Sequence, residues 1–477
     1  MHTPHTTFSP KCESLRLGAA AQRMIVPGLV LAVAGAAVAL LFGWRDSTRS
    51  MFFHAYLVSF VFYLTITLGS LFFVLLHHLA RAGWSTALRR LAEGLSANML
   101  LMAVLFLPVL GGMGYIYQWS HAPGEESQSA AKEGMAVAAP EATASPEAAN
   151  GESYKATYVG KDYWLKPKWF VVRFAIYFLV WNFLASYLRN QSIRQDTSGD
   201  VWRSTAMERI SAPGMMIFAV TLTGAAVDLI MSLNPEWGST MIGVYFFADS
   251  VLMGFVTITL LAMWLQANDL LHGAVNVEHY HDLGKLTFGF VFFWGYIAFS
   301  QYMLIWYANM PEETQFYIPR QIGPWAAVSI TLIFFHFLIP FAGLMSRHVK
   351  RCLPVFSFWL VWLLVAHALD LFWLIMPNTY IQKIPEAVGM APGTPLPQAF
   401  KHLLASHQSV YSLAQSSASF AAQVQAPLEP AALATLVGLL VAMGGLYMVN
   451  TARLLQGASL VPLHDPKLNE ALNFHNS

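Results

Sequence analysis

Long apolar stretches recur along the whole sequence, and each is long enough to cross a lipid bilayer as one helix. A spanning helix needs roughly 20 apolar residues, because it rises about 1.5 Å per residue through a hydrocarbon layer about 30 Å thick. Ten such stretches lie at residues 24–43, 51–76, 97–117, 168–189, 211–232, 239–266, 285–308, 323–346, 353–376 and 431–453. Since lipid offers no partner to an unpaired backbone group, the sequence predicts an all-α integral membrane protein with ten transmembrane helices.

The composition agrees with a membrane location and argues against several other classes. Of the 477 residues 56% are hydrophobic and 11% are charged, whereas soluble domains carry about 25% charged residues. The two cysteines, Cys12 and Cys352, are too few for a disulfide framework or a cysteine-held iron–sulfur cluster. The formal net charge of +1 argues against nucleic acid as a partner. Residues 1–23 are polar and show no signal-peptide cleavage site, so we expect the first span to direct the chain to the membrane.

Lysine and arginine are unevenly divided between the two sides of the predicted helices. They gather in three connections on one side, as Arg81, Arg89 and Arg90, as Arg194, Arg203 and Arg209, and as Arg347, Lys350 and Arg351. Cytoplasmic loops are enriched in these residues, so we expect residues 1–23 and the tail 454–477 to be cytoplasmic. The long connections 118–167 and 377–430 then face outward. The first is rich in Ala, Pro, Glu and Ser, and the second is predicted to hold short interfacial helices.

A short internal repeat suggests how the spans group. The string TITL occurs at residues 65–68 in the second span and 257–260 in the sixth. Such a repeat suits two four-helix bundles, formed by spans 2–5 and 6–9, with the first and tenth spans as peripheral helices. We therefore expect residues 24–453 to form one membrane domain.

One span, within residues 281–314, is unusually polar for a helix in lipid. Tyr296, Ser300 and Gln301 lie well inside it, and it ends at Asn309 with the run Pro-Glu-Glu-Thr following closely. Lipid penalises polar groups that lack a partner. This span is therefore predicted to face protein, water or a ligand, beside a proton path.

Ionisable side chains inside predicted spans are the main candidates for function. They are His54, Arg173, Asp228, Asp249, His336, His367 and Asp370. Those near span ends, His54 and Arg173, have a second interpretation as side chains that reach the membrane surface, and Asp228 as a cap of a neighbouring element. The deeper ones are predicted to relay protons, with Tyr296, Ser300 and Gln301 extending the relay. Plain hydrogen bonds that hold the helices together are the alternative.

The histidines do not form a pattern typical of a redox centre. No predicted span carries two of them at the spacing that sandwiches a haem, and His272, His279 and His281 fall in a predicted loop. We therefore expect no catalytic residue, no metal site and no covalently held cofactor in this chain. Whether a quinone or quinol binds is left open by the sequence.

Longer strings resemble a known family. Residues 228–245, DLIMSLNPEWGSTMIGVY, resemble the signature of the NrfD/PsrC-like membrane subunits of alternative complex III, with Leu229 where the family usually has Trp and Gly238 where a larger residue is common. Residues 76–93, LHHLARAGWSTALRRLAE, and the run at 311–314 favour the ActF type within that family.

The resemblance implies a subunit of a quinol:cytochrome c oxidoreductase in a bacterial cytoplasmic membrane. In that family, haem and iron–sulfur centres belong to c-type cytochrome and iron–sulfur subunits, and the main quinol site to a sister subunit of the ActC type. The ActF type is expected to share the two-bundle fold and to conduct protons. Two alternatives stay open: a quinone-binding membrane anchor of a molybdenum-type oxidoreductase, and an ion-coupled secondary transporter.

Overall fold

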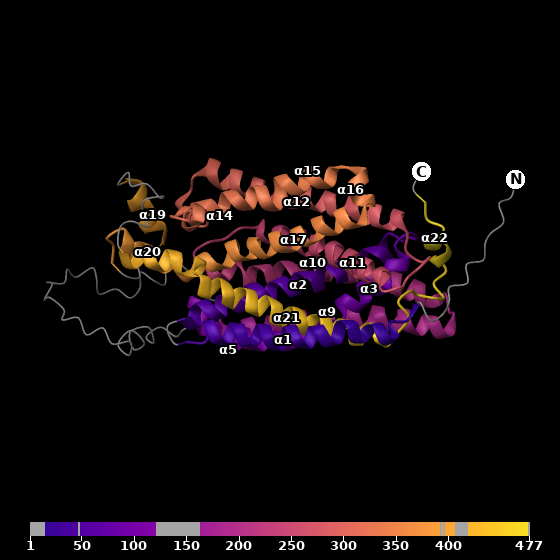
Figure 1. Cartoon of the computed structure of the whole chain (residues 1–477). Helices are drawn as coiled ribbons and strands as arrows, with labels where there is room; N and C mark the ends of the chain where they lie inside the picture. Colours follow the sequence, from indigo (N-terminus) through magenta and orange to yellow (C-terminus); the bar gives the residue numbers. More distant parts are fainter. Residues whose placement is uncertain are drawn as a thin grey trace.

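The computed structural model describes residues 15–45, 48–120, 163–391, 394, 396–405 and 418–475. Every named element in these ranges is a helix. Ten segments are long and apolar enough to cross a membrane: Gly18–Gly43, Arg49–Leu79, Thr86–Gly111, Pro167–Ser198, Trp202–Leu233, Ile242–Ala267, Val277–Ala308, Trp325–Met345, Leu353–Thr379 and Ala418–Gln456. They run side by side along the long axis of the molecule (Figure 1). The predicted class, an all-α integral membrane protein with ten spanning helices, is confirmed.

Several spans are built from more than one helical element. The main helical elements of the ten spans are α1 (Gln22–Gly43), α2 (Arg49–Leu79), α3 (Thr86–Ser96), α4 (Met99–Leu105), α5 (Leu107–Gly111), α9 (Pro167–Ser198), α10 (Trp202–Leu229), α11 (Ile242–Ala267), α12 (Val277–Ala308), α14 (Trp325–Leu332), η8 (Ile333–Leu338), α15 (Ile339–Met345), α17 (Leu353–Ile375) and α21 (Pro430–Gln456).

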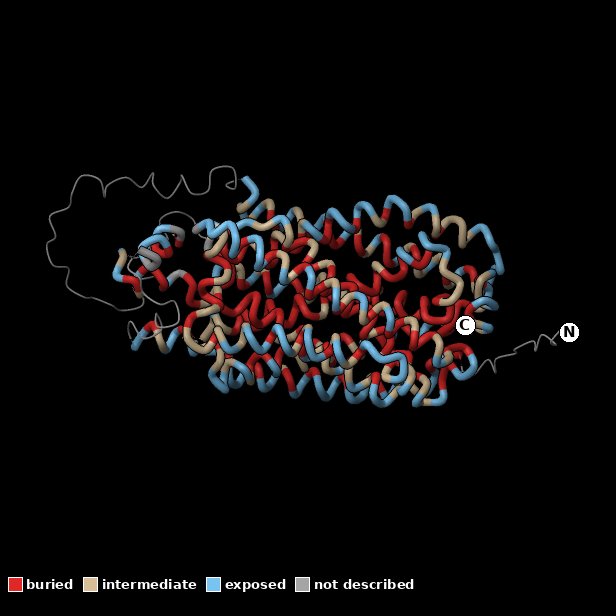
Figure 2. The backbone as a smooth tube through the Cα atoms, turned by 90° about the horizontal axis from the view of Figure 1, so that it is seen from above, coloured by how far each residue is buried: buried red, intermediate tan, exposed pale blue. Residues whose placement is uncertain are grey.

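The helices group into two bundles that meet along α2 and α11. The first consists of α2, α3–α5, α9 and α10, and the second of α11, α12, α14–α15 and α17. Buried residues fill the middle of the molecule, and exposed ones surround it (Figure 2). The two central helices come closest at Gly69 and Gly254, where a Cβ on Gly69 would lie 1.7 Å from the carbonyl oxygen of Ser250. Only glycine allows the backbones to approach this closely.

The first and tenth spans, α1 and α21, pack against each other at the side of the bundles. Their contact consists of small residues: a Cβ on Gly35 would lie 2.5 Å from the carbonyl oxygen of Gly438 and the amide nitrogen of Ala442. Small residues at this spacing let membrane helices pack closely without large side chains between them. The opposite face of α1 is exposed and apolar, with Val30, Val33 and Leu41 among its residues, as expected for a peripheral helix facing lipid.

The arginine-rich connections lie at the end of the molecule where the described chain begins, at Leu15, and where its last described residues lie (Figure 1). At this end the third span starts at Thr86, eleven residues before its apolar stretch at 97–117, because α3 precedes that stretch and belongs to the same span. Arg89 and Arg90 therefore lie inside the span, each 1% exposed, rather than in the expected loop. They tolerate burial because Glu93 pairs with both, Asp465 with Arg89 and Asp196 with Arg90.

The eighth span contains a π-helical segment, η8, directly before Pro340. In π geometry the carbonyl of Phe335 would bond the amide five residues on, but Pro340 has no N–H. The indole Nε1 of Trp362 instead donates to this carbonyl at 2.7 Å. The segment places His336 on the buried side of the span.

The opposite end of the molecule carries the longer connections. Short helices are present in the predicted connection 377–430: α18 (Ile384–Ala387) and α19 (Leu396–Ala405) lie between the ninth and tenth spans, and α20 (Ala418–Gln425) begins the tenth. Most of the other long connection predicted, residues 121–162 of 118–167, lies outside the described residues.

Candidate functional site

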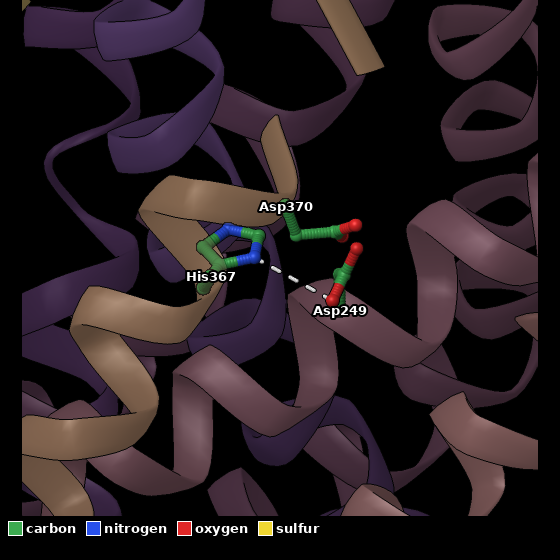
Figure 3. Close-up of side chains that lie close together, drawn as sticks. All are labelled: Asp249, His367 and Asp370. Atoms are coloured by element: carbon green, nitrogen blue, oxygen red, sulfur yellow. Dashed lines mark ion pairs between the residues drawn. The ribbon is translucent and has the colours of Figure 1, made fainter. Parts of the chain in front are cut away.

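Three of the predicted site residues meet between α11 and α17. Asp249 belongs to α11, and His367 and Asp370 lie one turn apart on α17. All three are at most 1% exposed. One carboxylate oxygen from each aspartate and one ring nitrogen of His367 lie within 4.8 Å of one another. Figure 3 shows the two carboxyl groups facing each other and the imidazole ring beside Asp249.

The hydrogen bonds of Thr65 determine which nitrogen of His367 carries a proton. The Thr65 hydroxyl donates to the carbonyl of Phe62 at 2.8 Å, and its Oγ1 lies 2.9 Å from His367 Nε2. A hydroxyl has one proton to donate, so with the Thr65 proton on the Phe62 carbonyl the matching tautomer of His367 has Nε2–H donating to Thr65. His367 Nδ1 then faces Asp249 Oδ1 at 3.5 Å, with a lone pair in the neutral ring and a proton only in the charged ring.

A tyrosine completes the group on its other side. Tyr245 donates a hydrogen bond of 2.5 Å to Asp370 Oδ1, and it lies one turn before Asp249 on α11. Sequence reasoning missed both Tyr245 and Thr65 as site residues. The spacing of Tyr245 and Asp249, four residues apart and hence on one helix face, was the available signal; Thr65 gave none, because it comes from the other bundle.

The arrangement demands a proton or another cation between its members. Beyond the contact between the two carboxyl groups, neither oxygen of Asp249 has a hydrogen-bond partner among the described residues, nor has Oδ2 of Asp370 or Nδ1 of His367. Unpaired charge in such a buried place is costly, and no lysine or arginine of the described chain forms an ion pair with these carboxylates. The group can therefore hold and pass a proton. Its donor set, two carboxylates and an imidazole, is also one that a metal cation accepts.

His336 lies near this group but is held differently. Its ring packs against Trp294 at an interplanar angle of 40°, with centroids 3.9 Å apart, and within the described chain neither of its nitrogens has a hydrogen-bond partner. It is fully buried by the π-helical segment. His336 is thus a second buried imidazole that can accept a proton, one helix away from His367.

Asp228 and Arg173 form a separate ion pair in the first bundle. Arg173 donates to both oxygens of Asp228, at 2.8 and 2.7 Å, while Trp164 and Tyr177 donate to the same carboxylate. Arg173 also stacks on Trp164, with its Cζ 4.1 Å from the ring centroid. A carboxylate with four donors and a matched cation has little capacity left for proton exchange, so this pair fits the structural interpretation.

The remaining predicted residues are not brought to the cluster. His54 bonds the carbonyl of Ser50 through Nδ1 and lies eleven residues before Thr65 on α2, about 16 Å along the helix axis. Tyr296 is 58% exposed on the outside of α12, and Ser300 is half-buried. Gln301 alone of that polar run is buried, at 4% exposure.

Comparison of the sequence with models of known protein families and with curated proteins gives no match.

Proposed function

We propose that this chain is a membrane subunit of a respiratory quinol:cytochrome c oxidoreductase, of the NrfD/PsrC-like family and the ActF type, and that it conducts protons. Two independent features support the proposal. The string at residues 228–245 resembles the family signature. The second bundle contains two carboxyl groups and an imidazole that are buried and close together, as a proton path through a membrane protein requires.

The observation that carries the proton-conducting role is the continuous row of exchangeable groups across the cluster. Asp370 faces Asp249, and Asp249 faces His367 (Figure 3). At the two ends of this row, Tyr245 bonds Asp370 and His367 bonds Thr65. A proton entering at Tyr245 displaces the one on Asp370, and protons then shift between the carboxyl groups and the imidazole. Aspartate and histidine suit this task because each exists in two protonation states when buried and partnered.

Electron transfer is assigned to partner subunits in this proposal. They are iron–sulfur and c-type cytochrome subunits, which carry the haem and iron–sulfur centres, and a sister subunit of the ActC type, which holds the main quinol site. The membrane is a bacterial cytoplasmic membrane, with both ends of the chain in the cytoplasm. The charge bias supports this orientation, because the arginine-rich connections lie at the same end of the molecule as the chain ends.

Purification of the chain from its native membrane under mild detergent tests the proposal. We expect it to migrate on a native gel together with subunits that show haem absorbance, and the preparation to oxidise quinol with reduction of cytochrome c. Migration alone, with neither haem absorbance nor this activity, would overturn the proposal in favour of a secondary transporter. A molybdenum-containing partner would instead identify a reductase anchor.

A further inference from the structure

A cavity of about 390 Å³ lies in the second bundle, at the end opposite the chain ends. It is enclosed by α12, α14, η8 and α17, and its volume lies in the range of about 300–1,000 Å³ that is usual for ligand pockets. Aromatic rings make up much of its wall. They include Trp294, Phe316, Tyr317, Phe337 and Trp373.

Two buried N–H donors of the cavity wall have no hydrogen-bond partner among the described residues. They are Nε2 of Gln301 and Nε1 of Trp294, whose residues are 4% and 3% exposed. Buried donors are rarely left unpaired, because each costs the loss of its hydrogen bond to water. Both donors therefore favour an acceptor oxygen inside the cavity, and neither is used by the proton cluster.

Arg320 is a buried cation in the wall of the same cavity. Arg320 is 3% exposed, and its guanidinium donates to the backbone carbonyls of Phe316, Trp373 and Leu374. No carboxylate of the described chain forms an ion pair with it. Burial lowers the pKa of Arg320 to about 10, so the guanidinium stays charged at neutral pH. Its field favours an electron-rich oxygen in the cavity.

Tyr245 connects the cavity with the proton cluster. Its ring lines the cavity, and its hydroxyl proton is committed to Asp370. The hydroxyl oxygen can still accept a hydrogen bond. A hydroxyl-bearing ligand would thus complete a chain from its own O–H through Tyr245 to Asp370.

The mouth of the cavity opens on the apolar flank of the bundle. The exposed residues of its wall are Phe299, Tyr302, Ile330, Ile333 and Leu338, which are 63%, 40%, 57%, 54% and 42% exposed. An occupant entering between such side chains comes from the lipid rather than from water. The site therefore selects a ligand with an apolar body and few polar atoms.

We propose that this cavity binds the ring of a lipid-soluble quinol or quinone. A ring carbonyl accepts from Gln301 or Trp294, and a ring hydroxyl donates to Tyr245. The site lies in this chain, separate from the quinol site that the family resemblance places in the sister subunit. Only its link to proton conduction rests on the proposed function; binding itself does not.

Photolabelling of the purified full-length protein tests the proposal. The probe is an azido derivative of a short-chain ubiquinone, and decylubiquinone is the competitor. We expect label on peptides that contain residues 294–302 or 317–338, and loss of that label with excess decylubiquinone. Label elsewhere only, or equal displacement by a phospholipid without a quinone ring, would show that the cavity holds lipid acyl chains and would overturn the proposal. This labelling test uses the protein without substitutions, so its result does not depend on whether a variant folds.

Two substitutions examine the polar contacts. Gln301→Leu should weaken binding of decylubiquinone roughly threefold to tenfold, the usual effect of one lost hydrogen bond. Tyr245→Phe should weaken binding of decylubiquinol and leave decylubiquinone unchanged, because only the quinol has a hydroxyl to donate. The control is Tyr296→Phe, on the same helix as Gln301 but exposed and outside the cavity. Unchanged binding in both cavity variants would contradict the assigned contacts.

The two proposals fail separately. Labelling of the cavity in a protein that carries no haem-bearing partner would retain the site and reject the complex. A complex that oxidises quinol but shows no label in this chain would retain the function and reject the site.

Discussion

Thr65 Oγ1 of α2 lies 2.9 Å from Nε2 of His367 of α17, so a hydrogen bond from the first bundle orients a histidine of the second. Because Thr65 gives its own proton to Phe62, it determines the tautomer of the ring as well as its position. The other ring nitrogen is thereby kept for Asp249. One side chain thus couples the position of the first bundle to the proton-exchanging cluster of the second.

Replacing Thr65 by valine should disturb proton translocation through His367. Valine keeps the shape of threonine but leaves Nε2–H without an acceptor, which costs about 1–3 kcal/mol. We expect a lower proton-to-electron ratio in vesicles that contain the reconstituted complex, with a small loss of thermal stability. Thr65→Ser, which keeps the hydroxyl, should restore both. A serine variant as impaired as the valine variant would indicate that packing at this position matters, rather than the hydrogen bond.

Asp249→Asn should impair proton translocation more than assembly. Asparagine has nearly the shape of aspartate but cannot release a proton, so the path from Asp370 to His367 is interrupted. We expect the complex to migrate normally on a native gel and quinol oxidation to continue, while the proton-to-electron ratio falls. An unchanged ratio would remove Asp249 from the path. Asp269→Asn, an exposed carboxylate in the turn that follows α11, is the control.

The sequence predicts the class of fold well, because apolar length alone determines whether a helix can span. It also identifies Asp249, His367 and Asp370, since acids are conspicuous in apolar helices. Their convergence could not be derived, because it depends on how α11 rotates against α17. The same limit applies to the polar run on α12, where Gln301 faces inward and Tyr296 outward.

The predicted start of the third span is wrong because its charged residues indicate a loop. Arg89 and Arg90 were assigned to a loop because isolated charges are costly in lipid, yet Glu93, Asp196 and Asp465 neutralise them inside the bundle. Two of these partners are distant in sequence, so no local pattern reveals the pairing. The π-helical segment is equally invisible, because it depends on Trp362 of another span.

Breaking the Asp228–Arg173 pair should destabilise the protein without a direct effect on the proton path. Arg173→Met leaves a buried carboxylate without its cation, a change that typically costs about 3–5 kcal/mol. We expect a lower midpoint of thermal unfolding in detergent and less assembled complex. The double variant Arg173→Met with Asp228→Leu should regain much of the stability, since it removes both charges. The exposed Arg194 offers the control Arg194→Met, and a double variant no more stable than the single one would contradict the structural role.

The crossing of the central helices should tolerate no side chain at Gly69. A methyl group there would lie 1.7 Å from the carbonyl oxygen of Ser250, which is backbone and cannot rotate away. Gly69→Ala must therefore separate α2 from α11, and overpacking of this kind costs about 1–3 kcal/mol or more. Gly289→Ala on α12 is the matched control, because nothing lies within 4 Å of its added methyl; it should be neutral or slightly stabilising, since alanine favours helix more than glycine by about 1 kcal/mol. Thermal unfolding of the two variants in the same detergent measures the difference.

Gly69→Ala should also lower the proton-to-electron ratio of the complex that still assembles. The reason is that separation of α2 from α11 moves Thr65 away from His367. An unchanged ratio would show that the cluster does not need the first bundle.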